Sequence, residues 1–241
     1  MLTHMFWAYG EFSKMEKICA NSFIKNGFSL NIWTYGKNEI DIKDASIRDA
    51  REIIPESLIF LNQAGSYAGF SDLFRYSILC MYGGLYVDTD VISLKSANKI
   101  PTKPFLVTEK SQNGDLKING NVIFNPVRRN GNLIDLARVY AEKFPKSDIT
   151  WGEIGPSLLT AIVQSYPGHG FEIYPPDFAN HINYWDCPNA FIDESINFNI
   201  TEDMHFLHLY NEMWRRAGID KSLQFSSACL YEKLEKTFGS S

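Results

Sequence analysis

The sequence is poor in cysteine, and its four cysteines lie far apart. They are Cys19, Cys80, Cys187 and Cys229, and no two of them form a CxxC pair. A structural zinc site and a dense disulfide framework both need more closely patterned cysteines, so neither has support in this sequence. We expect four reduced thiols, as is usual for proteins of the cytosol.

Three further features are missing. No stretch approaches the ~20 apolar residues of a membrane-spanning helix, and the N-terminus lacks a basic segment followed by a long apolar run. The formal net charge is -5 and there is no basic run, which disfavours nucleic acid or an anionic membrane as a partner. We therefore expect a soluble, cytoplasmic protein without a membrane span. Peripheral association with the inner face of a bacterial membrane, or an anchor removed from the chain, are the alternatives.

The composition supports a sizeable core. Of the 241 residues, 45% are hydrophobic and 14% aromatic, which suits one domain covering residues 1–241. An aromatic strand at 4–9, a helix at 14–23 and a second strand at 30–35 form a βαβ unit, which implies a parallel sheet. The expected fold class is therefore α/β, a single domain with a mixed, mostly parallel central sheet flanked by helices.

Weaker signals extend this reading to the rest of the chain. The expected strands are 58–61, 105–109, 121–124, 171–174 and 205–210, with a hairpin return at 116–118, and the expected helices are 133–144, 155–164 and 223–237. Residues 42–51 read as polar and weakly helical, and residues 177–201 as irregular. We expect Ala228, Tyr231 and Leu234 of the last helix to pack on the sheet.

The stretch from Gly69 to Ile92 organises the chain. Its first half has apolar residues at three- and four-residue spacing, which predicts a helix from Phe70 to Met81. Asp72 and Arg75 lie three residues apart on a different face of this helix. Their side chains can therefore point into the same space.

Two glycines and two aspartates follow the helix. Gly83 and Gly84 predict its end, because glycine readily adopts the left-handed conformation of a helix C-cap. A short buried strand, 85–87, then leads to Asp88 and Asp90, whose side chains project to the same side of an extended segment. Such paired carboxylates suit a hard divalent cation that keeps other coordination positions free for phosphate.

Two other readings of the aspartates are open. They could be solvated loop residues with no ligand. Alternatively, DxDx(T/V) after an apolar strand is the nucleophile loop of haloacid-dehalogenase phosphatases. Here Ile92 stands at the last position of that motif, and roughly a third of the chain precedes a loop that normally lies near the N-terminus. Both features weigh against the phosphatase.

The run FSDLFRYSILCMYGGLYVDTDV resembles the SDxxRYxxLxxxGGxYxDxD signature of glycosyltransferases with a DXD-containing sugar-binding region. This is glycosyltransferase family 32, which includes the yeast initiating mannosyltransferase and the α-1,4-galactosyltransferases and is more distantly related to the clostridial glucosylating toxins. The resemblance implies a GT-A fold, a Rossmann-like arrangement, and transfer with retention of anomeric configuration. It names no catalytic nucleophile, and we assign none.

The resemblance also implies roles for single residues. Asp72 and Arg75 would hold the hydroxyls of the donor sugar and the diphosphate side. Asp88 would contact the ribose or sugar and the metal, and Asp90 would bind Mn²⁺ or Mg²⁺. Trp7, on the first strand, would receive the nucleotide base.

Further positions carry weaker assignments from the same resemblance. Tyr9 would join Trp7 at the nucleotide base. Asn119, Asn121 and Glu153 are candidates for the acceptor side, Glu153 because it precedes Gly155-Pro156, where the family has a TGP-like turn.

The late segment HLYNEMW resembles the family's closing HxWxxSW. It implies His208 as a metal ligand and Trp214 as a donor contact. His205 is the alternative ligand, but as i and i+3 on a strand the two histidines face opposite sides, so only one enters the site. Tyr210 replaces the first Trp of the family pattern and Met213 the Ser, which puts a serine contact to the donor phosphate in doubt.

These features predict a metal-dependent glycosyltransferase that moves a hexose from a nucleotide diphosphate sugar to a glycan or glycolipid acceptor, as in surface polysaccharide or glycan synthesis. A UDP-sugar is favoured over a GDP-sugar. A catalytically silent module that binds sugar nucleotides or carbohydrates is the alternative from another functional class.

Overall fold

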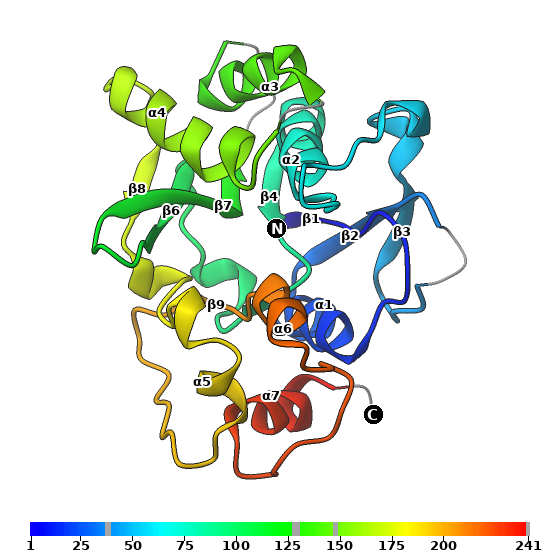
Figure 1. The fold of residues 1–241 in the computed structure, drawn as a ribbon, viewed down its shortest axis with the longest axis vertical. Helices are drawn as coiled ribbons and strands as arrows, with labels where there is room; N and C mark the ends of the chain where they lie inside the picture. The colour runs from blue at the N-terminus through cyan, green and yellow to red at the C-terminus, as the bar shows by residue number, and fades with distance from the viewer. Residues whose placement is uncertain (37–39, 127–130, 147–148, 240–241) are drawn as a thin grey trace.

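A seven-stranded sheet crosses the middle of the molecule, with helices on both of its faces (Figure 1). The computed structural model describes residues 1–36, 40–126, 131–146 and 149–239. Its strands are β1 Leu2–Phe6, β2 Ser29–Thr34, β3 Ser46–Asp49, β4 Gly84–Val87, β5 Val91–Ser93, β6 Phe105–Lys110, β7 Leu116–Asn125, β8 Glu172–Tyr174 and β9 Phe206–His208.

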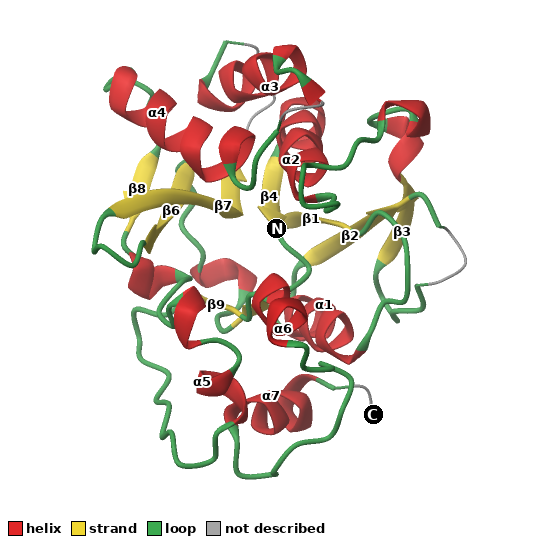
Figure 2. Ribbon diagram, viewed as in Figure 1, coloured by secondary structure: helices red, strands yellow, loops and turns green. Residues whose placement is uncertain are grey.

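The helices lie in two layers (Figure 2). They are α1 Lys14–Lys25, α2 Ala68–Tyr82, α3 Leu133–Lys143, η5 Glu153–Ser157, α4 Leu158–Ser165, α5 Asn189–Ile192, α6 Asn211–Ala217 and α7 Leu230–Phe238, with short 3₁₀ turns η1 Ala50–Glu52, η2 Glu56–Leu58, η3 Ala97–Lys99, η6 Pro176–Phe178 and η7 Tyr184–Asp186. In Figure 1, α2, α3 and α4 lie above the sheet, whereas α1, α5, α6 and α7 lie below it.

The sheet has the order β3-β2-β1-β4-β7-β6-β8 and is mixed but mostly parallel, as the sequence predicts. β1 pairs in parallel with both β2 and β4, and β2 pairs in parallel with β3. β7 runs antiparallel to β4 and β6, whereas β6 and β8 are parallel. The parallel pairing of β1 and β2 across α1 is the βαβ unit expected from the first 35 residues.

Alternation along β4 divides the core between the two faces of the sheet. Tyr86 packs with α2 residues such as Phe74, whereas Leu85 and Val87 face the opposite side. A third apolar cluster lies below the sheet, where α1 packs against α7 and the ribbon of β5 and β9. Strand β4 is therefore fixed on both faces, and the segment that follows it starts from a rigid position.

The organising stretch folds as predicted. α2 ends at the C-cap Gly83, whose φ of 66° lies in the left-handed region that favours glycine, and β4 follows directly. The predicted hairpin is also present, but residues 116–118 and 121–124 belong to the single strand β7. A register shift in β6 between Leu106 and Val107 lets one continuous strand pair along its length.

Several predicted elements are wrong. Residues 58–61 form no strand, and Leu58 and Leu61 are exposed, so this apolar run has no sheet to pack on. Residues 42–51 contain the edge strand β3, because pairing with β2 outweighs their polar composition. The last helix starts at Leu230 instead of 223. Ala228 lies before it and is exposed, and Tyr231 packs with residues of α1 instead of on the sheet.

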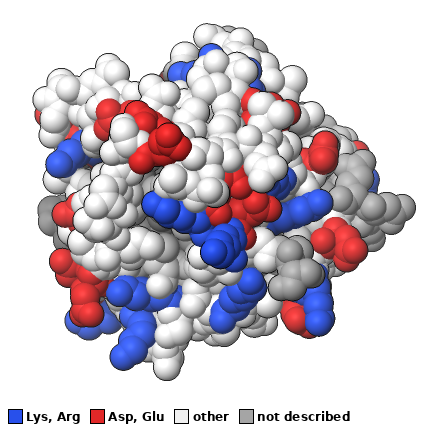
Figure 3. All heavy atoms as spheres, turned by 90° about the horizontal axis from the view of Figure 1, so that it is seen from below, with Lys and Arg blue, Asp and Glu red and all other residues white. Residues whose placement is uncertain are grey.

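The surface seen from below carries charges of both signs. Figure 3 shows Lys and Arg side chains interspersed with Asp and Glu on this face, so the face offers no single-signed surface to a partner. Among the residues that the structure describes, no helix combines the length and the apolarity that a membrane crossing requires.

Candidate active site

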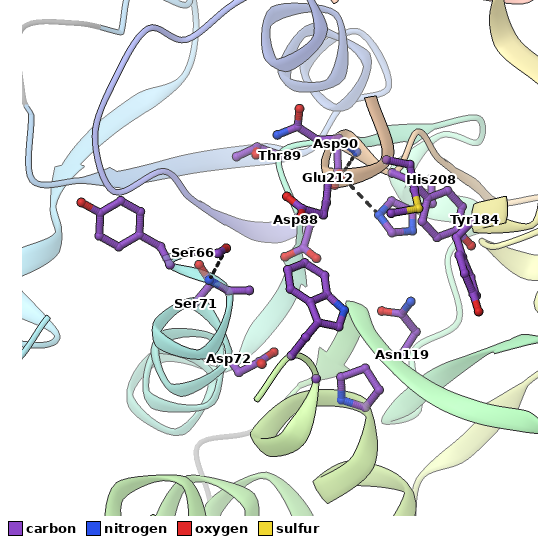
Figure 4. A pocket seen from close by; sticks show the side chains of 18 of the residues that line it. Ser66, Ser71, Asp72, Asp88, Thr89, Asp90, Asn119, Tyr184, His208 and Glu212 are labelled. Atoms are coloured by element: carbon purple, nitrogen blue, oxygen red, sulfur yellow. Dashed lines mark hydrogen bonds and ion pairs between the residues drawn. The ribbon is translucent and has the colours of Figure 1, made fainter. Parts of the chain in front are cut away.

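A cavity of about 740 Å³ opens where β1 and β4 end, and it is lined by residues from α2, β6, β7, the η5 turn and the segment around α6. Figure 4 shows its centre, with Asp88, Asp90 and His208 on one side and Asp72 of α2 on the other. Carboxyl ends of neighbouring parallel strands meet at one edge of a sheet, which is where α/β proteins place ligands. The sheet topology therefore creates this cavity.

Arg75 joins α2 to the end of β4. Its guanidinium donates to Asp72 Oδ1 and to Asp88 Oδ1, both at 2.8 Å, and it lies 5.2 Å from the centre of the Tyr86 ring. Burial raises the pKa of Asp72 to about 7, although Arg75 opposes this shift. The two aspartates and Arg75 thus form one connected ionic group that lines the cavity, with Asp72 and Arg75 buried and Asp88 partly exposed.

Two glycines make room for this group. A Cβ on Gly120 of β7 would lie 2.1 Å from Arg75 Nη1, and a Cβ on Gly155 of η5 would lie 2.5 Å from Asp72 Oδ2. Real side chains never come so close, so both positions require glycine for a close approach. The Gly155-Pro156 turn noted in the sequence therefore serves the Asp72 carboxylate directly.

Asp88, Asp90 and His208 form a compact group of potential metal ligands. One donor atom from each lies within 4.8 Å of the others, close to the spread of ligands around a single cation. The antiparallel ribbon of β5 and β9 brings them together, since Val91 pairs with His208. His208 Nε2 lies 3.3 Å from Asp90 Oδ2.

The side chain of Asn180 fixes the orientation of the His208 ring. Asn180 Nδ2 donates to the carbonyl oxygen of Thr108 at 3.0 Å, so its Oδ1 must face the other way. That oxygen lies 3.2 Å from His208 Nδ1 and accepts from Asn121 Nδ2 at 2.8 Å. His208 Nδ1 must therefore carry a proton, which directs Nε2 toward the carboxylates, as a hydrogen-bond acceptor behind a metal-binding histidine commonly does.

Charge and burial set the protonation of the three groups. Burial opposes a charge on His208, but the carboxylates of Asp90 and Asp88 outweigh it and raise the pKa of the imidazole. Burial likewise opposes ionisation of Asp90, yet His208 and the backbone N–H of Asn211, 2.8 Å from Asp90 Oδ2, lower its pKa. A cation at this site would replace the His208 proton, which is the usual competition at a metal ligand.

The structure brings most of the sequence-predicted residues into the cavity. Trp7 and Tyr9 line one end, and Asn119 lines the side opposite Asp72. The ring of Tyr9 stacks on Tyr35 with 5.7 Å between centroids, so it forms a supported aromatic wall.

Four predicted residues do not line the cavity. Trp214 is 1% exposed and packs against Tyr231, with its indole N–H bonded to the Leu209 carbonyl, so it supports the site from within the core. His205 stacks on Phe178 instead of facing the aspartates. The other two have local structural tasks: Asn121 is fully buried and holds Asn180, and Glu153 accepts bonds from Thr150.

Sequence reasoning missed two polar residues of the site. Glu109 of β6 lines the cavity and accepts a hydrogen bond from Asn119 Nδ2 at 2.7 Å, while burial raises the pKa of its carboxyl. Asn180 lies in the segment that reads as irregular. A strand alternation places Glu109 on the face of Val107, but only the tertiary structure shows which face meets the cavity.

Aromatic and basic residues cover the mouth of the cavity. Trp151 is 48% exposed and lies beneath the guanidinium of Arg216, 4.9 Å from its ring centre. Arg216 and Arg215 both pair with Glu212 of α6. The mouth is thus formed by two segments, the turn before η5 and helix α6, that meet through one cation–π contact.

Part of the chain is similar to a known family of proteins. Residues 16–106 match the family model described as "Glycosyltransferase sugar-binding region containing DXD motif". The chain is thus similar to this family over less than half of its length. The matched range includes α1, α2, β4 and both aspartates.

A human protein resembles this chain in sequence. Alpha-1,4-N-acetylglucosaminyltransferase from Homo sapiens is 26% identical over 161 residues, which cover 59% of this chain. The aligned part is 42% of the human protein, so the chain spans less than half of that relative.

Two solved structures resemble this chain in fold. "PaToxG Glycosyltransferase" has a TM-score of 0.50 at 15% identity, covering 98% of this chain and 86% of its own. "WbbM bifunctional glycosytransferase apo structure" also has a TM-score of 0.50, at 8% identity, covering 98% of this chain and 49% of its own. With the mixed, mostly parallel sheet, these likenesses confirm the GT-A fold.

Proposed function

We propose that this protein is a single-domain, metal-dependent retaining glycosyltransferase that transfers a hexose from a nucleotide diphosphate sugar to a carbohydrate acceptor. The observation that carries the proposal is the group of Asp88, Asp90 and His208 at the base of a cavity of about 740 Å³. A cavity of this size falls in the range of small-molecule sites. Two carboxylates and one imidazole are a donor set for a divalent cation, and a diphosphate needs such a cation.

Mn²⁺ is the cation that this donor set suits best. Carboxylates bind both Mn²⁺ and Mg²⁺, but Mg²⁺ favours oxygen ligands and transition metals accept imidazole. The Asn180 bond to His208 Nδ1 leaves Nε2 available as the ligand atom. When bound, the cation would neutralise the diphosphate leaving group as a Lewis acid.

The donor would lie along the cavity with its base beside Trp7 and Tyr9 and its sugar beside Asp72. Both aromatic residues line the end of the cavity next to β1, and Tyr9 is held against Tyr35. Such a rigid aromatic wall suits a planar base. Asp72, fixed by Arg75, offers carboxylate oxygens to sugar hydroxyls.

The acceptor would enter from the mouth of the cavity, opposite Asp72. Glu109 and Asn119 lie on that wall, and each offers polar atoms to a hydroxyl. The exposed ring of Trp151 offers an apolar face of the kind on which a sugar ring packs. A UDP-sugar as donor and a glycan or glycolipid as acceptor are part of this proposal.

Donor hydrolysis and donor binding test the proposal together. Wild type is incubated with a panel of UDP- and GDP-sugars in Mn²⁺, Mg²⁺ or EDTA, and thermal shift reports binding because a ligand of the native state raises stability. We expect Mn²⁺-dependent release of one nucleotide diphosphate. The anomeric configuration of a transfer product, read by NMR, tests retention.

Asp90→Asn tests the role of the metal-ligand group. It keeps the size of the side chain and removes the carboxylate charge, so we expect a folded protein with at least a hundredfold slower hydrolysis, about 3 kcal/mol of transition-state stabilisation. An unchanged rate in this variant contradicts the proposal. Binding without turnover across all metals and acceptors would indicate a silent binding module, and release of phosphate from simple phosphomonoesters would indicate a phosphatase.

A further inference from the structure

Lys221 lies outside the set of donor-facing residues, but it contacts three parts of the site. Its ammonium group is paired with the carboxylate of Glu16, donates to Asn211 Oδ1 at 2.7 Å, and lies 5.4 Å from the centre of the Trp7 ring. The Lys221 side chain is 19% exposed and that of Glu16 is fully buried. The backbone carbonyl of Lys221 is also fixed, by the hydroxyl of Tyr231 at 2.7 Å.

Asn211 links Lys221 to the metal-ligand group through two hydrogen bonds. While its side-chain oxygen accepts from Lys221, its backbone N–H donates to Asp90 Oδ2 at 2.8 Å. The position of Asn211 at the start of α6 therefore depends on Lys221. The Asp90 carboxylate depends in turn on Asn211 for one of its hydrogen bonds.

Glu16 holds the ammonium group of Lys221 and is itself held by the start of α1. Its second carboxylate oxygen accepts from the backbone N–H and the hydroxyl of Ser13, at 2.9 and 2.6 Å, in the capping box that begins α1. Because a buried carboxylate needs a partner of opposite charge, Glu16 fixes Lys221 in one position. The first turn of α1 is thus tied to the metal-ligand group through two side chains.

We propose that Lys221, held by Glu16, is a positioning residue that orients Asp90 through Asn211 and supports Trp7 through its charge. Lys221 then supports both the metal-ligand group and the residue proposed to bind the nucleotide base. This inference rests on the proposed function, since it takes Asp90 as a metal ligand and Trp7 as part of the base wall.

The test replaces the ion pair without leaving a buried charge. Lys221→Met combined with Glu16→Gln removes both charges at once, and Lys14→Met combined with Glu232→Gln is the matched control. Lys14 pairs with Glu232 at 2.7 Å between α1 and α7, with side chains 15% and 9% exposed. Each double variant removes one positive and one negative charge, one of them from α1, but only the first pair includes the side chain that donates to Asn211.

Mn²⁺ affinity is measured by electron paramagnetic resonance without nucleotide, and urea midpoints confirm folding. We expect about tenfold weaker Mn²⁺ binding in the Lys221 pair variant, as for loss of a group that orients a ligand, and wild-type affinity in the control pair. Lys221→Arg, which keeps the charge and several donors, should retain Mn²⁺ affinity within about threefold of wild type, since guanidinium can bond both partners. Equal Mn²⁺ affinity in wild type and both pair variants overturns the inference, as does an equal loss in both.

Nucleotide binding tests the contact with Trp7 separately. UDP and GDP are titrated in EDTA, and the Lys221 pair variant should bind the preferred nucleotide about threefold more weakly than the control pair. If wild type binds Mn²⁺ but neither nucleotide, the proposed function fails, whereas the Mn²⁺ comparison still decides whether Lys221 positions Asp90. If wild type binds no Mn²⁺, the inference itself is refuted.

Discussion

Asn180 is expected to set the affinity of the site for its cation, and Asn180→Ala tests this. The residue is 2% exposed, and its amide bridges the Thr108 carbonyl, Asn121 and His208 Nδ1. Alanine removes the group that holds the His208 ring and its tautomer. The ring is then free to rotate or to present the protonated nitrogen to the cation.

The expected magnitudes follow from these contacts. The substitution leaves the Asn121 amide and the Thr108 carbonyl without a partner, and each unsatisfied buried group costs about 1–3 kcal/mol. Because water can enter the space that the amide vacates, we expect a loss of about 2–4 kcal/mol in unfolding free energy. Loss of the hydrogen-bond partner that orients a metal-binding histidine should lower Mn²⁺ affinity by about 10–100-fold.

Asn125→Ala separates these two effects. Asn125 is also 2% exposed, and its amide bonds the Leu79 carbonyl and Asn132, away from the cavity. Urea unfolding should show that both variants lose stability, while Mn²⁺ titration should show weaker binding only in Asn180→Ala. Wild-type Mn²⁺ affinity in folded Asn180→Ala would refute the role of Asn180 in orienting His208.

Three other predictions follow from protonation and packing. The pKa of His208 is raised, so its proton competes with the cation below that pKa. Mn²⁺ affinity measured from pH 5 to 8 should rise by up to tenfold per pH unit and then level off. A flat profile would exclude His208 as a ligand. Gly120→Ala should displace Arg75 and weaken donor binding at least tenfold in calorimetry, whereas Gly168→Ala, which meets nothing within 4 Å, should bind as wild type does. Burial raises the pKa of Asp72 to about 7, so the native state keeps a proton that the unfolded chain loses near pH 4. The unfolding free energy should therefore fall as pH rises from 4 to 7, by up to about 1.4 kcal/mol per pH unit. Asp72→Asn should flatten this decline in urea unfolding.

The sequence by itself determined the part of the site that is encoded locally. Helical spacing, the glycines at 83 and 84 and a short apolar run are sufficient to predict α2, β4 and the two aspartates that follow. Asp72 and Arg75 are three residues apart on one helix, so their meeting is also a local property. The motif in this stretch resembles the family whose model matches residues 16–106, and its residues are all close in sequence.

Local patterns failed where a distant partner decides the outcome. The run at 58–61 is apolar but has no strand to pair with, whereas the polar segment 46–49 forms β3 because β2 lies beside it. Trp214 has the right position in its motif, yet it packs inside the core with Tyr231. Burial and strand pairing depend on the whole chain, and a single segment cannot encode them.

The tertiary structure alone decided what surrounds Asp90. The register of β5 against β9 brings His208 to it, a loop turn brings Asn180 to His208, and Lys221 reaches it through Asn211. These contacts join segments from the middle and the end of the chain, and no periodicity links them. Charges and hydrogen bonds act over a few ångströms in space, so only the folded arrangement determines which polar groups share a site.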